Sequence, residues 1–90
     1  MKFEWHGRKA TANFTKHEVS FEEAATVFAD ELALSGSDPD HSLEEHRYVI
    51  FGRSAAGRVL VVAYTERGER IRLISARQAT RSERVLYEKG

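Results

Sequence analysis

Apolar and polar residues follow two different periods along the chain, and the period changes near its middle. At residues 2–5, KFEW alternates polar and apolar residues, as a short strand with one buried face does. After it, apolar residues recur at helical spacing, and from Tyr48 onward β-branched and aromatic residues dominate. The pattern predicts a strand, two helices, three or four further strands and a last helix.

The first predicted helix covers residues 8–17 and is short and amphipathic. Ala10, Phe14 and His17 fall at positions i, i+4 and i+7, so they share one face. Lys16 and His17 bring cationic side chains to the carboxyl end, where the helix dipole favours them. The helix is therefore expected to end near His17.

A second helix is predicted over residues 21–29. Ser20 and Glu23 have the spacing of a capping box, and apolar residues follow at helical intervals. Residues 35–46, SGSDPDHSLEEH, carry glycine, proline and small polar residues and predict a loop.

Three alternating stretches follow and predict an antiparallel meander, because short glycine-bearing segments, SAAG and ERGE, separate them. They are RYVIFGR, RVLVVAYT and RIRLISAR, at residues 47–53, 58–65 and 70–77. Thr80 and Glu83 repeat the capping-box spacing, which predicts a last helix over about residues 81–88.

These elements indicate an α+β fold in a single domain over residues 1–90: an antiparallel β-sheet with two N-terminal helices and one C-terminal helix. The helices are expected on one face of the sheet, with the other face or its rim left for function. Alternation in RIRLISAR places three residues toward one face and three toward the other. The first set is Ile71, Leu73 and Ser75, and the second is Arg70, Arg72 and Ile74.

Charge is balanced in total but not along the chain, which has 14 basic and 14 acidic residues. Residues 1–45 hold 4 basic and 10 acidic side chains (4 − 10 = −6), and residues 46–90 hold 10 and 4 (10 − 4 = +6). Such a split suggests a basic face suited to phosphates, or two halves that complement each other across the fold. The second half has nine arginines and one lysine, and guanidinium is the better bidentate phosphate ligand.

Several classes of function are excluded or disfavoured. The chain has no cysteine, hence no thiol nucleophile, disulfide or thiolate metal site. No apolar run approaches the roughly 20 residues of a membrane span, so no membrane association is predicted and the cytoplasm is the expected location. One acidic, histidine-bearing loop matches no known ligand spacing, so neither a metal nor another cofactor is predicted. Its residues are Asp38, Asp40, His41 and His46.

The closing residues RIRLISARQATRSERVLYEKG concentrate arginine around Glu83. The five arginines are Arg70, Arg72, Arg77, Arg81 and Arg84. On an open sheet face they would bind phosphates. The alternative is a solvated face on which arginine stems shield apolar neighbours. Glu83 has two interpretations as well, either the partner of Thr80 in the helix cap or a catalytic carboxylate.

Two further side chains are candidates for chemistry. His17 could transfer a proton near neutral pH, or could only satisfy the last carbonyls of its helix. Tyr87 could orient a phosphate, or could anchor the last helix.

Arginines plus a histidine, without cysteine or metal, suit RNA cleavage in which the substrate's own 2′-OH attacks the adjacent phosphate. This reaction needs a base, fixed positive charge for the developing oxyanions and a proton for the leaving oxygen. We expect His17 to be the base or acid and Arg72 and Arg77 to supply the charge. A non-catalytic module that binds nucleic acid or a partner protein through the same face is the alternative.

Three blocks of the chain together resemble the BrnT family of type II toxin–antitoxin toxins. They are FEW, KHEVSFEEAATVFAD and GRSAAGRVLVVAYTERGERIRLISARQATRSERVLY, which span nearly the whole chain. The resemblance implies a RelE-like fold and a ribonuclease that cleaves cellular RNA and halts translation. It also implies a cognate BrnA-like antitoxin of ribbon-helix-helix type that neutralises the toxin, and a complex that binds its own operator DNA.

The catalytic candidates lie inside matching blocks, and further residues are placed as candidates for substrate binding: Arg47, Arg53, Arg81 and Tyr87. Two positions depart from the family pattern. His6-Gly7 stands in place of Asp-Pro and is expected to remove an N-cap, and Glu18 stands in place of a glycine suited to a left-handed helix end.

Overall fold

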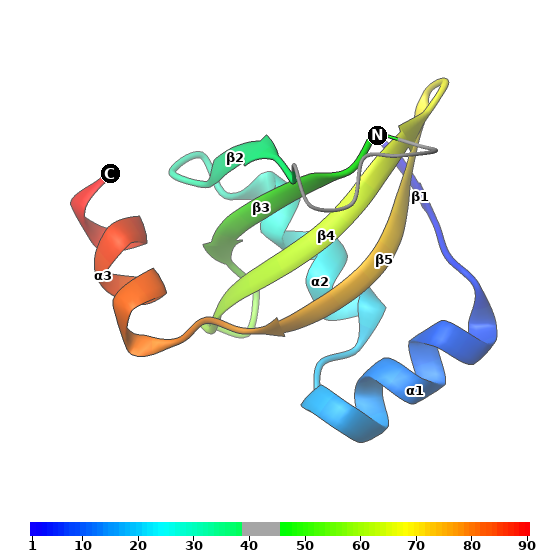
Figure 1. The fold of residues 1–90 in the computed structure, drawn as a ribbon, viewed down its shortest axis with the longest axis horizontal. Coiled ribbons are helices and arrows are strands. Elements are labelled where there is room, and N and C mark those ends of the chain that lie inside the picture. The colour runs from blue at the N-terminus through cyan, green and yellow to red at the C-terminus, as the bar shows by residue number, and fades with distance from the viewer. Residues whose placement is uncertain (39–45) are drawn as a thin grey trace.

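The structure of the protein, a computed structural model, describes residues 1–38 and 46–90. Its elements have the predicted α+β character, with helices before and after the strands (Figure 1). In chain order they are β1 (Lys2–Glu4), α1 (Gly7–His17), α2 (Phe21–Thr26), the 3₁₀ turn η1 (Val27–Ala29), β2 (Leu34–Ser37), β3 (Tyr48–Arg53), β4 (Val59–Arg67), β5 (Arg70–Gln78) and α3 (Arg81–Lys89).

The strands form one five-stranded sheet in the order β1-β5-β4-β3-β2. Strands β3, β4 and β5 make the predicted antiparallel meander. The sheet is nevertheless mixed, because β1 pairs with β5 in parallel and aligns Phe3 with Ile71. The expectation of a purely antiparallel sheet is therefore wrong at this edge. Everything from α1 to β4 connects the two paired strands, far more than the roughly dozen residues that a parallel connection requires.

β2 lies where the sequence predicts only loop. Its residues LSGS are poor strand formers, yet Leu34 pairs with Phe51 and Ser37 with Tyr48 on β3. Pairing with an available sheet edge has overridden local propensity. The remainder of the predicted loop includes Asp40 and His41, which lie outside the described residues.

A register shift in β5 changes which residues face the core. Ala63 pairs with Ser75 and Tyr64 with Leu73, which leaves Ile74 as an extra residue. The predicted alternation is therefore wrong beyond Leu73. Ser75 is exposed rather than directed with Leu73 toward the core, and the next residue returns to it.

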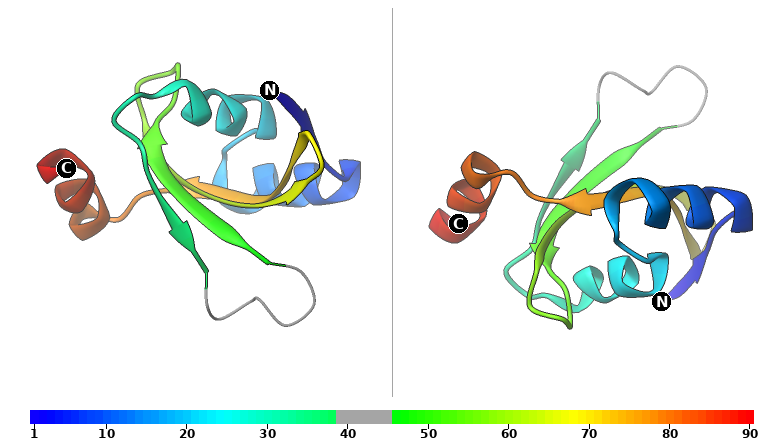
Figure 2. Two further views of the ribbon diagram at one scale, coloured as in Figure 1. Left: turned by 90° about the horizontal axis from the view of Figure 1, so that it is seen from above. Right: turned by 90° about the horizontal axis from the view of Figure 1, so that it is seen from below.

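The main core lies between the sheet and the helices α1 and α2. Its buried residues include Val19, Phe21, Ala24, Val27, Leu60, Val62, Leu73 and Ala76. A second, smaller cluster comprises Val59, Val61, Ala79 and Tyr87, packed with Val49 and Phe51. Because neighbouring residues of β4 point to opposite faces, α3 packs on the face away from α1 and α2. The prediction that all helices cover one face is thus wrong for α3, which lies beyond the end of β5 (Figures 1 and 2).

The side chain of Asn13 joins α1 to the edge of β5. β1 ends at the level of Arg72, and further along the strand the Asn13 amide donates to the carbonyl of Ala76 at 2.9 Å and accepts from its N–H at 3.0 Å. The same amide nitrogen donates to the carbonyl of Val19 at 2.9 Å. One buried side chain therefore closes a strand edge and fixes the turn between α1 and α2.

Both departures from the family pattern keep the ends of α1 intact. His6 is itself the N-cap, since its Nδ1 accepts from the N–H of Arg8 at 3.2 Å. Glu18 adopts the left-handed conformation, with φ of 58°, and its N–H donates to the carbonyl of Phe14 at 2.8 Å. The expected loss of the N-cap is wrong, and the helix ends in the left-handed residue without glycine.

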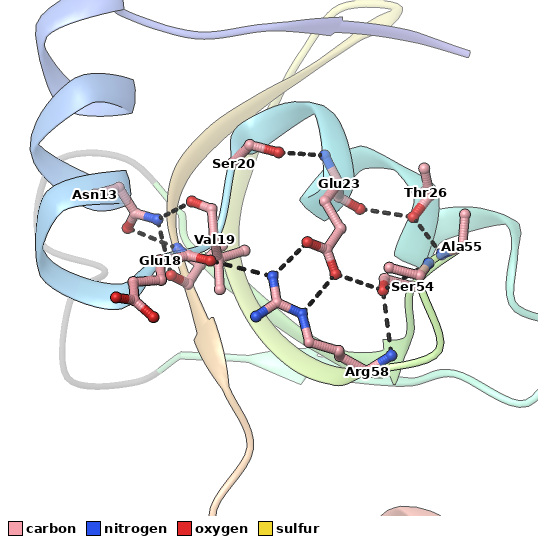
Figure 3. A network of polar contacts seen from close by, with 11 residues as sticks. Asn13, Glu18, Val19, Ser20, Glu23, Thr26, Ser54, Ala55 and Arg58 are labelled. Atoms are coloured by element: carbon pink, nitrogen blue, oxygen red, sulfur yellow. Dashed lines mark hydrogen bonds and ion pairs between the residues drawn. The ribbon is translucent and has the colours of Figure 1, made fainter.

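An ion pair fastens the start of α2 to the β3–β4 turn (Figure 3). Arg58 donates to both carboxylate oxygens of Glu23, and Ser54 donates to the same carboxylate. The hydrogen bond from Arg58 lowers the pKa of Glu23. The predicted capping box is therefore only half formed: Ser20 accepts from the N–H of Glu23, but the carboxylate of Glu23 turns to Arg58.

At α3 the capping box is complete, which confirms the sequence interpretation. Thr80 accepts from the N–H of Glu83 at 3.2 Å, and Glu83 accepts from the N–H of Thr80 at 2.8 Å. Arg77 adds two parallel hydrogen bonds to Glu83, at 2.7 and 2.8 Å. The bonds from Arg77 are the main reason that the pKa of Glu83 falls from 4.5 to about 2.

Replacing Asn13 tests the edge closure. Asn13→Ala leaves the N–H and C=O of Ala76 and the carbonyl of Val19 without this partner, and we expect it to lower the free energy of unfolding by about 2–3 kcal/mol. Urea unfolding measures the change. Thr15→Ala, at an exposed position of the same helix, is the control and should stay within about 0.5 kcal/mol. Equal effects of the two substitutions would contradict the assignment.

The lowered pKa of Glu83 predicts a pH dependence. A carboxylate whose pKa is lowered on folding stabilises the protein above its unfolded pKa, and this stabilisation is lost as pH falls toward the folded value. The difference in unfolding free energy between wild type and Glu83→Gln should therefore be largest above pH 4.5 and should shrink as the pH falls toward about 2. Unfolding free energies of both proteins across this range give the comparison, and an advantage that does not change with pH would contradict it.

Candidate functional site

The face of the sheet away from α1 and α2 carries arginines in rows set by the strand register. Arg72 lies across from Thr65 on β4. Continuing the β3–β4 register one residue beyond Tyr48 and Tyr64 places Arg47 on the other side of Thr65. Arg77, further along β5, lies across from Val61. Three of the predicted site residues, Arg47, Arg72 and Arg77, are thus brought to one face, which we call the open face.

Between the two arginine rows the open face is lined by small side chains. Ser75 pairs with Ala63, which pairs with Val49, and Val49 pairs with Gly36 on β2. At about 3.3 Å per residue, Ser75 lies roughly 7 Å from Arg77 along β5. Ser75 therefore lies between Arg72 and Arg77 along the strand.

Arg72 is held by a carboxylate that the sequence did not reveal as its neighbour. Its Nη1 donates to Glu4 at 2.9 Å, and Arg70 lies 3.7 Å from the same carboxylate. Glu4 is 68 residues away in sequence and reaches Arg72 only through the parallel β1–β5 pairing. The ion pair directs the guanidinium while 28% of the Arg72 side chain remains exposed.

Arg77 is shared between the cap of α3 and the open face. Its bidentate bond to Glu83 raises the pKa of Arg77 and orients the guanidinium plane. The side chain is still 41% exposed, so one side of it can meet a ligand. Glu83 makes the helix-cap contacts expected of the N3 residue, which favours the structural interpretation of this carboxylate.

His17 ends α1 beside β5. It is half-buried and lines a hollow of about 300 Å³ together with Ile74 and Ser75 of the strand. The level of Ser75 lies between Arg72 and Arg77, so His17 is placed next to the middle row of the open face.

Two lysines that the sequence analysis did not single out line the same hollow. Lys9 and Lys16 lie seven residues apart on α1 and face β5 beside Asn13. The signal in the sequence was their helical spacing, within a segment that has no acidic residue from Gly7 to His17.

Arg53 and Tyr87 belong to a different part of the structure, at the end of the sheet under α3. The Tyr87 hydroxyl donates to Asp30 at 2.5 Å, and the backbone N–H of Arg53 donates to the same carboxylate at 2.8 Å. These bonds, the one from Arg53 first, lower the pKa of Asp30, and the bond to Asp30 raises the pKa of Tyr87. The Arg53 guanidinium lies 5.7 Å from the centre of the Tyr87 ring. Tyr87 thus anchors α3, as one of its two interpretations proposed.

The remaining arginine candidate, Arg81, is exposed at the first residue of α3. It lies four residues beyond Arg77 and has no role in the helix cap, which Thr80 and Glu83 supply. It adds an exposed basic residue just past the end of β5.

One buried hydroxyl lies in the first arginine row. Thr65 is 1% exposed, and within residues 1–38 and 46–90 its Oγ1 is the one buried side-chain polar atom without a hydrogen-bond partner. Such atoms are rare in folded proteins. In the strand register this residue lies between Arg47 and Arg72.

Two features are absent from the described part of the chain. Within it, no group of three or more histidine, cysteine or acidic residues could hold a metal ion. Within it too, no helix is long and apolar enough to cross a membrane.

Comparisons with known proteins place this geometry in context. A search of curated protein sequences found no match. Among solved structures, the ribonuclease toxin BrnT of Brucella abortus matches with a TM-score of 0.66 and 21% identity, over 90% of this chain and 99% of that one, and so confirms the α+β fold. The sequence model of the family described as "Ribonuclease toxin, BrnT, of type II toxin-antitoxin system" matches residues 5–83. Because this match covers most of the chain, the protein belongs to the BrnT family of ribonuclease toxins.

Proposed function

We propose that this protein is a metal-independent endoribonuclease that cleaves RNA on the open face. The proposal rests on the placement of Arg72, Arg77 and His17 along β5, since Ser75 lies between the two arginines in the strand and lines the same hollow as His17. Membership of a ribonuclease toxin family supports the class of reaction.

In the proposed reaction, the 2′-oxygen of one nucleotide attacks the neighbouring phosphorus. A 2′-O–P bond forms, the bond to the 5′-oxygen breaks, and the products end in a 2′,3′-cyclic phosphate and a 5′-hydroxyl. The proposed reaction requires no metal and no external nucleophile. The protein supplies charge stabilisation and proton transfer.

Arg72 and Arg77 would bind the non-bridging oxygens, on which negative charge grows in the transition state. Both guanidinium groups are held in advance by carboxylates, Glu4 and Glu83. Such fixed charges need little reorganisation during the reaction, which is the main source of electrostatic catalysis. The phosphate would bind to the exposed side of each guanidinium.

His17 would transfer the proton, taking it from the 2′-hydroxyl or giving it to the 5′-oxygen. Imidazole suits either role near neutral pH. Arg47, one residue before β3, would bind an adjacent part of the RNA backbone. Arg53 and Arg81 would bind the RNA farther from the cleaved linkage. Tyr87 would act indirectly, by holding α3 in place.

The biological role that we propose follows from the toxin–antitoxin description of the family. Cleavage of cellular RNA in the cytoplasm would halt translation. A cognate BrnA-like antitoxin of ribbon-helix-helix type would cover the basic face and neutralise the toxin, and only the complex would bind operator DNA.

The rival function is a binding module without catalysis. It is favoured by one observation, that Arg72 and Arg77 are already ion-paired and so could serve structure and affinity alone. A module would bind RNA with strong salt dependence and leave it intact.

The test is cleavage of end-labelled RNA by antitoxin-free protein in EDTA. We expect wild type to cut, and Arg77→Ala and Arg72→Ala each to lose about 100-fold or more, because each removes fixed charge next to the scissile phosphate. His17→Ala should lose about 100-fold through proton transfer. Circular dichroism and urea unfolding verify that each variant is folded.

Two controls separate catalysis from structure. Glu83→Gln removes the carboxylate that Arg77 binds but keeps the guanidinium, so it should retain far more activity than Arg77→Ala. Arg8→Ala removes an exposed arginine outside the site and should cut as wild type does. Folded wild type that binds RNA and leaves it intact would show that the isolated chain is a binding module.

A further inference from the structure

We infer that the hollow between α1 and β5 is a second phosphate-binding subsite, which holds the RNA backbone beside the scissile phosphate. The inference rests on the proposed function and specifies its substrate as a single-stranded RNA longer than a dinucleotide. The residues that carry it are Lys9 and Lys16, with His17 and Ser75.

The distribution of charge singles out this helix. The first half of the chain is acidic, with ten acidic and four basic residues, yet three of those four basic residues lie on α1. They are Arg8, Lys9 and Lys16. None of the described residues that line the hollow is acidic, and two of them are lysines. A concave surface with one sign of charge attracts a ligand of the opposite charge.

The side chains around the hollow divide into those already used by the fold and those available to a ligand. The amide of Asn13 is committed to Ala76 and Val19. Lys9, Lys16 and Ser75 are exposed. Lys9 and Lys16 lie about 10 Å apart along the helix axis, so they can contact successive positions of one extended strand. Lysine binds phosphate as a flexible point charge without fixed geometry. This suits an RNA backbone that must shift along the surface until the scissile phosphate is in place.

The hollow is continuous with the open face through Ser75. This residue lines the hollow and also belongs to the middle row between Arg72 and Arg77. The exposed position of Ser75 follows from the extra residue Ile74, since without it strict alternation would turn Ser75 toward the core. An RNA chain whose scissile phosphate lies between Arg72 and Arg77 therefore passes Ser75 and reaches the two lysines.

Two substrates test the subsite by activity. One is a dinucleoside monophosphate, whose single phosphate is the scissile one. The other is a DNA hexamer with one ribonucleotide at its centre, which provides the same cleavable phosphodiester. Wild type in EDTA should have the higher kcat/KM for the hexamer. In Lys9→Ala/Lys16→Ala the ratio of the two values should fall about tenfold, and in Lys89→Ala, on α3, it should stay at the wild-type value.

Binding tests the subsite independently of cleavage. The probe is a fluorescent all-DNA hexamer, which has no 2′-hydroxyl and cannot react. The logarithm of the association constant falls linearly with the logarithm of the salt concentration. The slope should be shallower in the double variant by about 1.4, since two lysine–phosphate contacts each contribute about 0.7 on a single strand. A double variant with the salt slope of wild type would overturn the inference. A wild type that cuts neither substrate would overturn the proposed function, while the salt slope would still decide on the subsite.

Discussion

The hydrogen bonds of Asn13 are the interaction on which the arrangement of the site depends. A strand edge with free N–H and C=O groups must be paired or covered, and β1 ends too early to pair with the later part of β5. Asn13 satisfies Ala76 there and, through Val19, fixes the turn into α2. The same contact holds the whole of α1 against β5, and so determines where His17 and the two lysines lie.

Ion pairs on the open face connect stability with function. Arg77 completes the cap of α3 through Glu83, while Arg72 on β5 joins the edge strand β1 through Glu4. Each pair fixes a guanidinium, that of Arg72 toward β1 and that of Arg77 toward the start of α3, and leaves part of the side chain exposed. A phosphate that binds there adds to these contacts without requiring the arginines to be rearranged. The concentration of arginine in a chain with no net charge is thereby accounted for, since the acidic partners come from other elements.

The sequence predicted local structure well where a single physical signal controlled it. Periodicity and capping residues located α1, α2, β3, β4, β5 and α3, and Thr80 with Glu83 formed the complete cap. Apart from the N-cap that His6 supplies, the failures involve pairing between strands or packing between elements. β2 has weak strand propensity and exists because β3 provides an edge, and the parallel pairing of β1 cannot be inferred from KFEW alone. The register shift at Ile74 leaves no mark in a simple alternation, so the exposure of Ser75 was missed.

Prediction of the site was limited in the same way. The number and positions of the arginines indicated the open face, because the charges along a sequence can be read without knowing how the chain packs. The partner of Arg72 was missed, since Glu4 reaches it from the other end of the chain. Tyr87 had two interpretations, and only the packing of α3 against Asp30 shows that it is an anchor.

The central claim is that the RNA supplies its own nucleophile to a protein that contributes only charge and proton transfer. The most direct measurement compares two oligonucleotides in EDTA, identical except for a 2′-hydroxyl or a 2′-hydrogen at the cleaved step, with mass spectrometry of the product ends. The account predicts that only the hydroxyl form is cut and that the product carries a 2′,3′-cyclic phosphate. Cleavage of the deoxy form, or a product formed only when metal is restored, would contradict it.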